Sequence, residues 1–153
     1  MNHPSIRQLA ACLVAGLLLA GCTSQATRSE APADGKDTKV VERRAIERWD
    51  LLIQKKAEKA YDFLSPGFRA TKKREDYAQE MNNRPVRWTK VLPYKQACDK
   101  PDICILDLQI DYSTKMPGVG TDVSSVGFVR ETWIRSKGQW YMLPDAKPAT
   151  GGQ

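Results

Sequence analysis

The sequence predicts an α+β domain in which three N-terminal helices pack on one face of an antiparallel sheet of about four strands. Two observations support this fold class. Apolar residues recur at helical spacing between residues 40 and 81, and after Pro85 the pattern changes to the two-residue alternation of strands. The chain has 153 residues, which is enough for one such domain and short for two.

The first predicted helix covers residues 40–54 and is amphipathic, with charged residues between the apolar ones. Its apolar face consists of Val41, Ala45, Trp49, Leu52 and Ile53. At this spacing Trp49 is expected to lie in the core, although an aromatic side chain that stacks on a ligand is the alternative interpretation.

Two shorter helical segments are expected to follow. The apolar face of the second is formed by Ala57, Ala60, Tyr61 and Leu64, and Tyr61 has the same two interpretations as Trp49. This segment is expected to end at Ser65-Pro66-Gly67, with a short extended piece at Phe68-Arg69. A third helix is predicted over residues 73–81, ending before Asn82-Asn83.

Four strands are predicted in the second half of the chain. The first begins at Val86 and is expected to break or bend near Pro93. The others cover residues 104–112, 125–135 and 140–143, and the last two form a hairpin that turns at 136–139. The clearest strand alternates an apolar set with a more polar one: Cys104, Leu106, Leu108, Ile110 and Tyr112 against Ile105, Asp107, Gln109 and Asp111.

The two faces of this sheet give two kinds of candidate residue. Asp107, Gln109 and Asp111, together with Trp133, are expected on the exposed face, where they form a candidate interaction surface. Arg130 shares a strand face with apolar residues and is therefore the candidate polar group inside an apolar cavity. A buried Arg needs an anion, either a protein carboxylate or a ligand, unless it lies at the rim.

The N-terminus predicts export from the cytoplasm. A short start with Arg7 is followed by twelve apolar residues, 9–20, and then by small residues, as in a secretory signal. Twelve residues are too few for a transmembrane helix, which needs about 20. Residues 1–21 are therefore expected to be a signal peptide, 22–39 a flexible tether, 40–148 the folded domain and 149–153 a loose tail.

The end of the signal, Leu19-Ala20-Gly21-Cys22, resembles a bacterial lipobox. The resemblance implies cleavage before Cys22, a lipid on its thiol and acylation of the new amino group. It also implies a membrane partner. Because Thr23 is not the Asp that commonly retains such proteins at the inner membrane, it favours the outer membrane, on the side that faces the periplasm.

Removal of the signal peptide would exclude several kinds of catalysis. The single His of the chain is His3, so the remaining 132 residues would have no imidazole for a Ser-His-Asp triad or a His-ligated metal. Their side chains would sum to +5, from 23 basic and 18 acidic residues. Since acids are interspersed among the basic clusters, we expect solvated helix faces, no nucleic-acid partner and no cofactor.

Two cysteines remain in the predicted domain, Cys98 and Cys104. An even pair in an oxidising compartment, separated by turn-forming residues, predicts a disulfide. A redox-active pair is the alternative, but the spacing is not Cys-x-x-Cys.

Two stretches resemble the nuclear-transport-factor-2-like superfamily, which includes SnoaL-like and ketosteroid-isomerase-like proteins. They are Trp49…Ala60-Tyr61-Asp62-Phe63-Leu64-Ser65-Pro66…Arg69 and the closing hairpin Glu131-Thr132-Trp133-Ile134-Arg135-Ser136-Lys137-Gly138-Gln139-Trp140-Tyr141. The resemblance covers about residues 40–144. It implies a curved sheet wrapped around the first helix as a cone, with room for a cavity.

Two functional hypotheses follow. The first is a non-catalytic envelope lipoprotein whose domain binds or assembles with another envelope protein. The second is a cavity that binds or transforms a small apolar ligand. No catalytic motif of the superfamily maps onto the chain. The remaining conceivable chemistry is an Asp general base with a Tyr or a protonated acid as the oxyanion donor. The conceivable participants are Asp62, Tyr77, Tyr112 and Arg130.

Overall fold

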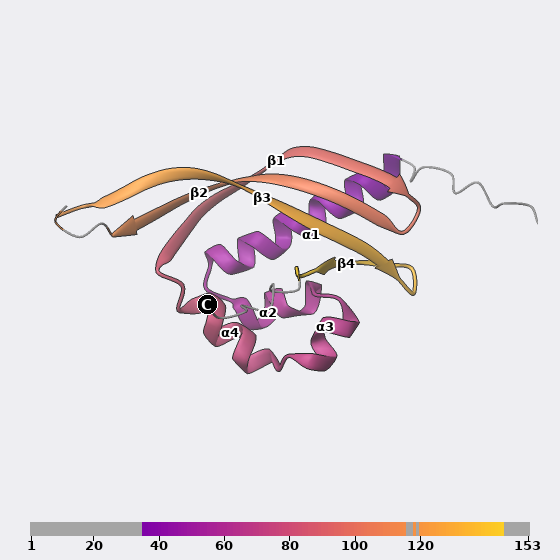
Figure 1. Cartoon of the computed structure of the whole chain (residues 1–153), viewed down its shortest axis with the longest axis horizontal. Helices are drawn as coiled ribbons and strands as arrows, with labels where there is room; N and C mark the ends of the chain where they lie inside the picture. The colour runs from indigo at the N-terminus through magenta and orange to yellow at the C-terminus, as the bar shows by residue number, and fades with distance from the viewer. Residues whose placement is uncertain (1–34, 116–117, 119, 146–153) are drawn as a thin grey trace, which may run out of the picture.

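The computed structural model describes residues 35–115, 118 and 120–145 (Figure 1). The predicted signal peptide, the lipid site Cys22, residues 22–34 of the tether and the tail 149–153 lie outside this range. The elements, in chain order, are α1 (Gly35–Ile53), α2 (Ala57–Ala60), the 3-10 helix η1 (Tyr61–Phe63), α3 (Pro66–Thr71), α4 (Arg74–Asn82), β1 (Val86–Lys100), β2 (Ile103–Lys115), β3 (Asp122–Ser136) and β4 (Gln139–Leu143).

The four strands form one antiparallel sheet in the order β1-β2-β3-β4. The sheet curves over α1, and α2, α3 and α4 lie on the far side of α1 from the sheet (Figure 1). This arrangement confirms an α+β class with helices on one face of a four-stranded antiparallel sheet. In the described part of the chain, no helix combines the length and apolar character needed to span a membrane.

The core lies between α1 and the concave face of the sheet. Most side chains predicted for this layer are buried, namely Val41, Ala45, Trp49 and Leu52 on α1, and Cys104, Leu106, Leu108 and Ile110 on β2. The last member of each predicted set, Ile53 and Tyr112, is only partly buried. Each large apolar side chain buried in this way stabilises the fold by about 1.5–3 kcal/mol. The periodicities of the sequence, about 3.6 residues in the helix and two in the strand, therefore identified the layer correctly.

Helix α1 begins at Gly35, five residues before the predicted start at 40, so the tether is shorter than expected. The reason is a contact with the distant β3–β4 hairpin. The Asp37 carboxylate accepts a hydrogen bond from Trp140 Nε1 at 3.1 Å and pairs with Arg135 Nη1 at 3.2 Å. An acidic residue in the first turn is also favourable for the helix dipole.

The expectation of an extended piece at Phe68-Arg69 is wrong, because these residues lie in α3. Ser65 is the N-cap of this helix, and its Oγ accepts a hydrogen bond from the Phe68 backbone N–H at 3.4 Å. Pro66 occupies the first turn, where its missing N–H costs nothing. The Ser-Pro pair that was expected to end one helix also begins another. The described residues therefore form four α-helices and one 3-10 helix, where three helices were expected.

Strand β1 continues through Pro93, where a break or bend was expected. The pairing with β2 does become irregular there, with a register shift between Pro93 and Lys95. Because β1 is an edge strand, the proline does not have to supply an N–H to a second neighbour.

The structure joins Cys98 and Cys104 by a disulfide, with their Cα atoms 4.1 Å apart across the β1–β2 hairpin. We predict that the double variant Cys98→Ser, Cys104→Ser unfolds with a free energy about 2 kcal/mol lower, because the cross-link restricts the unfolded chain. Chemical denaturation of both proteins without reductant measures the difference. Equal midpoints would contradict the prediction.

Candidate functional site

A cavity of about 820 Å³ lies between the concave face of the sheet and the helices. Its walls are mostly apolar and come from α1, α3, α4, β1, β3 and the end of β4. The residues that line it include Arg48, Trp49, Tyr77, Trp88, Val129 and Glu131. The volume is within the range of sites that hold a small molecule.

The Glu131 carboxylate lies on one wall of this cavity and is fully engaged. Its Oε1 accepts hydrogen bonds from Arg48 Nη1 at 2.9 Å and from Trp49 Nε1 at 2.7 Å. Its Oε2 accepts one from Trp133 Nε1 at 2.9 Å. Glu131 is 2 % exposed and Arg48 5 %, so this is a buried ion pair that ties α1 to β3. Removing one partner of such a pair is costly, because the other charge stays buried and unpaired.

Two further polar atoms beside this ion pair have no hydrogen-bond partner among the described residues, the Tyr77 hydroxyl and Arg48 Nε. Burial raises the pKa of Tyr77, and the positive charge of Arg48 acts in the opposite direction. Neighbouring side chains cover both atoms, so a ligand would reach them only if those side chains moved. Both atoms belong to residues that line the cavity and could each form a new hydrogen bond.

The convex face of the sheet has a different character. Arg130 donates two hydrogen bonds to the Asp107 carboxylate, from Nε at 2.7 Å and from Nη2 at 3.0 Å. Beside them the rings of Tyr94 and Phe128 meet edge to face, with centroids 5.2 Å apart. Tyr94, Val126 and Phe128 are 69 %, 57 % and 63 % exposed. This outer patch (Tyr94, Asp107, Val126, Phe128 and Arg130) combines exposed apolar side chains with one surface ion pair.

Two of the predicted side-chain orientations on β3 are wrong. Trp133 is 0 % exposed and packs in the core, whereas Arg130 points to the convex face and pairs with Asp107. The register explains this, since Arg130 is opposite Asp107 while Glu131 is opposite buried Leu106. Residues Val126 and Phe128 made their face look like the inner one. They are exposed because they share the face of Arg130, the convex face, which points away from the helices.

The remaining candidates are dispersed. Asp107, Gln109 and Asp111 lie on the convex face of β2, as the alternation predicts, and Gln109 donates a hydrogen bond to Asp111 at 3.1 Å. Of the four conceivable catalytic participants, only Tyr77 lines the cavity. Tyr112 instead covers Gly127, where an added Cβ would lie 3.3 Å from the ring.

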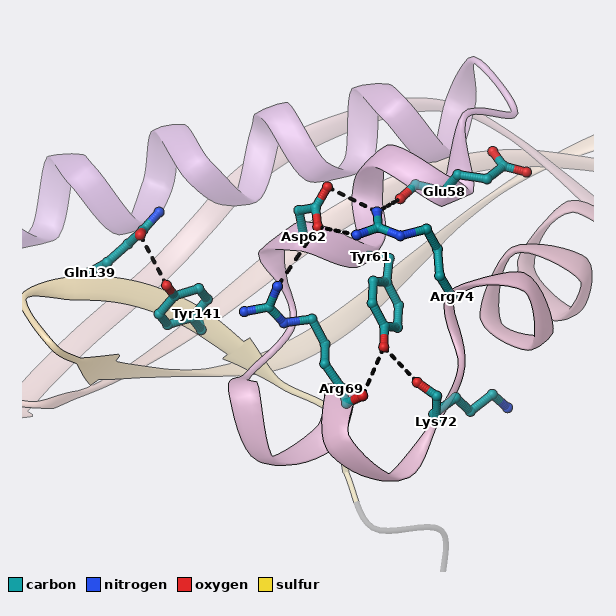
Figure 2. Close-up of polar contacts among 8 residues, drawn as sticks. All are labelled: Glu58, Tyr61, Asp62, Arg69, Lys72, Arg74, Gln139 and Tyr141. Atoms are coloured by element: carbon teal, nitrogen blue, oxygen red, sulfur yellow. Dashed lines mark hydrogen bonds and ion pairs between the residues drawn. The ribbon is translucent and has the colours of Figure 1, made fainter.

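The fourth, Asp62, belongs to a polar cluster that fastens the short helices together (Figure 2). It accepts two hydrogen bonds from Arg74, at 2.6 and 3.0 Å, and Arg69 approaches it at 3.7 Å. The Tyr61 hydroxyl lies 3.0 Å from the Arg69 carbonyl oxygen and 2.6 Å from that of Lys72, and it donates to these in turn. Tyr61 is thus a buried structural residue, and nothing in its surroundings indicates ligand stacking.

The cluster predicts a pH effect. Hydrogen bonds from Arg74 hold the pKa of Asp62 below its ordinary value. Such a carboxylate stabilises the fold above its unfolded-state pKa, and the contribution disappears as the pH falls through the lower folded-state pKa. We therefore expect Asp62→Asn to lose less stability on acidification than the parent chain, as measured by urea unfolding at neutral and acid pH. The same loss in both proteins would contradict this expectation.

The residues that prediction from sequence missed are Arg48 and Glu131. Arg48 is one of the charged residues between the apolar positions of the first helix, and Glu131 belongs to the closing-hairpin motif. A weak signal was available, because Glu131 shares its strand face with Trp133. The partners are 83 residues apart, so no local spacing connects them.

Among the described residues, no group of three or more His, Cys, Asp or Glu side chains is placed to hold a metal ion. No protein-family model matches the chain, and no curated protein matches it. The fold is similar to the solution structure of a SEC-C motif containing protein from Rhodopseudomonas palustris, with a TM-score of 0.50 and 13 % sequence identity. The match covers 66 % of this chain and 73 % of that one. At this identity the likeness concerns the fold alone.

Proposed function

We propose that this chain is a lipid-anchored protein of the bacterial envelope whose domain is a non-catalytic protein-binding or assembly module. The anchor is the lipid on Cys22, in the outer membrane and facing the periplasm. The finer fold is the nuclear-transport-factor-2-like cone, which is supported by the curved sheet around α1 and the cavity beside it. The disulfide is consistent with an oxidising compartment.

The observation that carries the binding role is the outer patch. Exposed Tyr94, Val126 and Phe128 lie close together beside the Asp107–Arg130 ion pair and the polar residues of β2. A monomer gains nothing by placing two aromatic rings in water, whereas interfaces are enriched in aromatic residues and Arg surrounded by polar groups. The patch therefore fits a folded protein partner whose surface combines apolar side chains with acidic and basic ones.

The test is chemical crosslinking in intact cells followed by recovery of the anchored protein. One envelope protein is expected to be recovered with the parent chain and lost with Tyr94→Ser or Asp111→Lys. Lys59→Ser, at an exposed position on α2, is the matched control and should recover it unchanged. Mass spectrometry should find Cys22 as the lipid-bearing first residue, and Cys22→Ala should lack the lipid. Recovery that is indifferent to Tyr94 and Asp111 would refute the use of this face.

The cavity supports a second candidate, the binding of a small apolar ligand with one polar group. Apolar walls of this extent beside Tyr77 and Arg48 provide both kinds of contact. Trp49 and Trp88 meet edge to face at 5.3 Å, and Trp88 lines the cavity, so their fluorescence reports on its contents.

Titration with the fluorescent fatty acid cis-parinaric acid tests this candidate. Saturable binding is expected for the parent chain, and it should be lost in Leu143→Trp, which places a bulky ring at the cavity wall. Ile103→Trp, at a similarly exposed position on the convex side of β2, should bind like the parent chain. Equal binding by all three proteins would locate the probe elsewhere and remove the candidate.

A further inference from the structure

In the described part of the chain, most of strand β3 has a neighbouring strand on one side only. Strand β3 pairs with β2 from Asp122 to Ile134, but β4 covers only Thr132–Ser136. Residues 122–131 of β3 therefore present one row of backbone N–H and C=O groups without a strand partner. Figure 1 shows β2 and β3 continuing beyond the end of α1, so α1 does not lie along the outer part of this edge.

The composition of this edge differs from that of the opposite one. The stretch Val123-Ser124-Ser125-Val126-Gly127-Phe128-Val129 has neither a charge nor a proline. The other edge, β1, carries Pro93, several Lys residues and three register shifts, all of which discourage pairing with another strand. Strand β4 is only five residues long. The protein thus has the usual protection against edge pairing on β1 and lacks it on β3.

We propose that this β3 edge pairs antiparallel with β3 of a second copy of the chain, about a two-fold axis at Val126, so that one sheet continues through a dimer. The available length sets this register. The free edge begins at Asp122, and β4 begins to pair opposite Thr132. An axis at Val126 lies four residues from Asp122 and four from Arg130, so the paired segment fills the edge without reaching β4.

Charge complementarity favours a second copy as the occupant. In this register Asp122 of each chain lies opposite Arg130 of the other, on the convex face. Asp107 uses Nε and Nη2 of Arg130, which leaves Nη1 for a second carboxylate. Directly opposite positions in an antiparallel pair are close enough for such contacts, and opposite charges there are stabilising.

The apolar side chains fit the same register. Val126 lies opposite itself, and exposed Phe128 lies opposite Ser124 of the second copy, whose small side chain leaves room for the ring. On the concave face Val123 lies opposite Val129. Pairing covers the apolar residues at this edge and satisfies its backbone groups, which is how one strand adds to another sheet. The pairing shares Val126, Phe128 and Arg130 with the outer patch, whereas Tyr94 on β1 and Asp111 on β2 lie outside the paired strand and therefore separate the two tests.

A cysteine at the axis tests the register directly. We would use the chain from Thr23 onward, which retains every described residue and lacks Cys12 and Cys22. Under oxidation by copper-phenanthroline, Val126→Cys is expected to convert most of the protein to a disulfide-linked dimer, because the two thiols face each other across the axis. Leu92→Cys, an exposed apolar position on β1, is the matched control and should stay monomeric on a non-reducing gel.

Sedimentation of the unmodified chain and of Val126→Lys gives an independent measurement. The parent chain is expected to dimerise with rising concentration, and the Val126→Lys variant to stay monomeric with an unchanged circular dichroism spectrum, because two like charges meet at the axis. A monomeric parent chain would overturn the proposal, and so would a dimer that persists in Val126→Lys and does not crosslink in Val126→Cys. A monomer that still recovers its envelope partner through Tyr94 would overturn the pairing alone and leave the proposed function intact.

Discussion

Replacing Glu131 with Gln is expected to lower the free energy of unfolding by about 3–5 kcal/mol, the cost of leaving a buried charge unpaired. Both carboxylate oxygens accept hydrogen bonds, from Arg48, Trp49 and Trp133. A glutamine keeps one acceptor and points an NH₂ group at an N–H donor. The variant therefore loses the charge that balances Arg48 and also introduces a clash between donors.

Urea denaturation measures the effect, and Arg130→Gln is the matched control. It removes the charge from an Arg–carboxylate pair on the convex face in which the Arg130 side chain is 73 % exposed, and it should change the midpoint little because surface ion pairs contribute little to stability. In the double variant Arg48→Met, Glu131→Gln, part of the lost stability should return, since the unpaired charge is gone. A small loss in Glu131→Gln, similar to that of the control, would mean that the pair is not buried.

The second large effect is expected at Trp133. Its replacement by Ala should cost about 3–5 kcal/mol, because a fully buried indole leaves a cavity in a close-packed core. Phe128→Ala, on the same strand and the opposite face, should change stability by about 0.5 kcal/mol or less. Thermal or urea unfolding of the two variants compares the faces of β3 directly.

Comparing Trp133→Ala with Phe128→Ala is informative because the sequence pattern alone suggests that Phe128 is buried and Trp133 exposed. If Phe128→Ala were the more damaging change, the register of β3 against β2 would have to shift by one residue, which would exchange the two faces. Loss of stability in Trp133→Ala is also expected to be smaller in a Glu131→Leu background, since the Trp133 N–H then has no carboxylate to lose.

The sequence by itself determined the fold class, the order of the four strands, the disulfide and most of the core. These features depend on local information, namely the helical spacing of Val41 to Leu52, the alternation along β2 and the pairing of two nearby cysteines. The early start of α1 was not predictable, because Asp37 finds its partners in a hairpin about 100 residues away. Likewise Ser65-Pro66 is compatible with a helix end and with a helix start, and packing selects between them.

Only the tertiary structure decided which face of β3 is buried. A period of two shows that Arg130 shares a face with Phe128, and Glu131 with Trp133, but it does not say which face meets the helices when both carry aromatic residues. The cavity and the Arg48–Glu131 pair follow from the same non-local event, the docking of α1 against the sheet. Buried charges are stable only in pairs, so the position of one partner cannot be understood until the fold has brought the other to it.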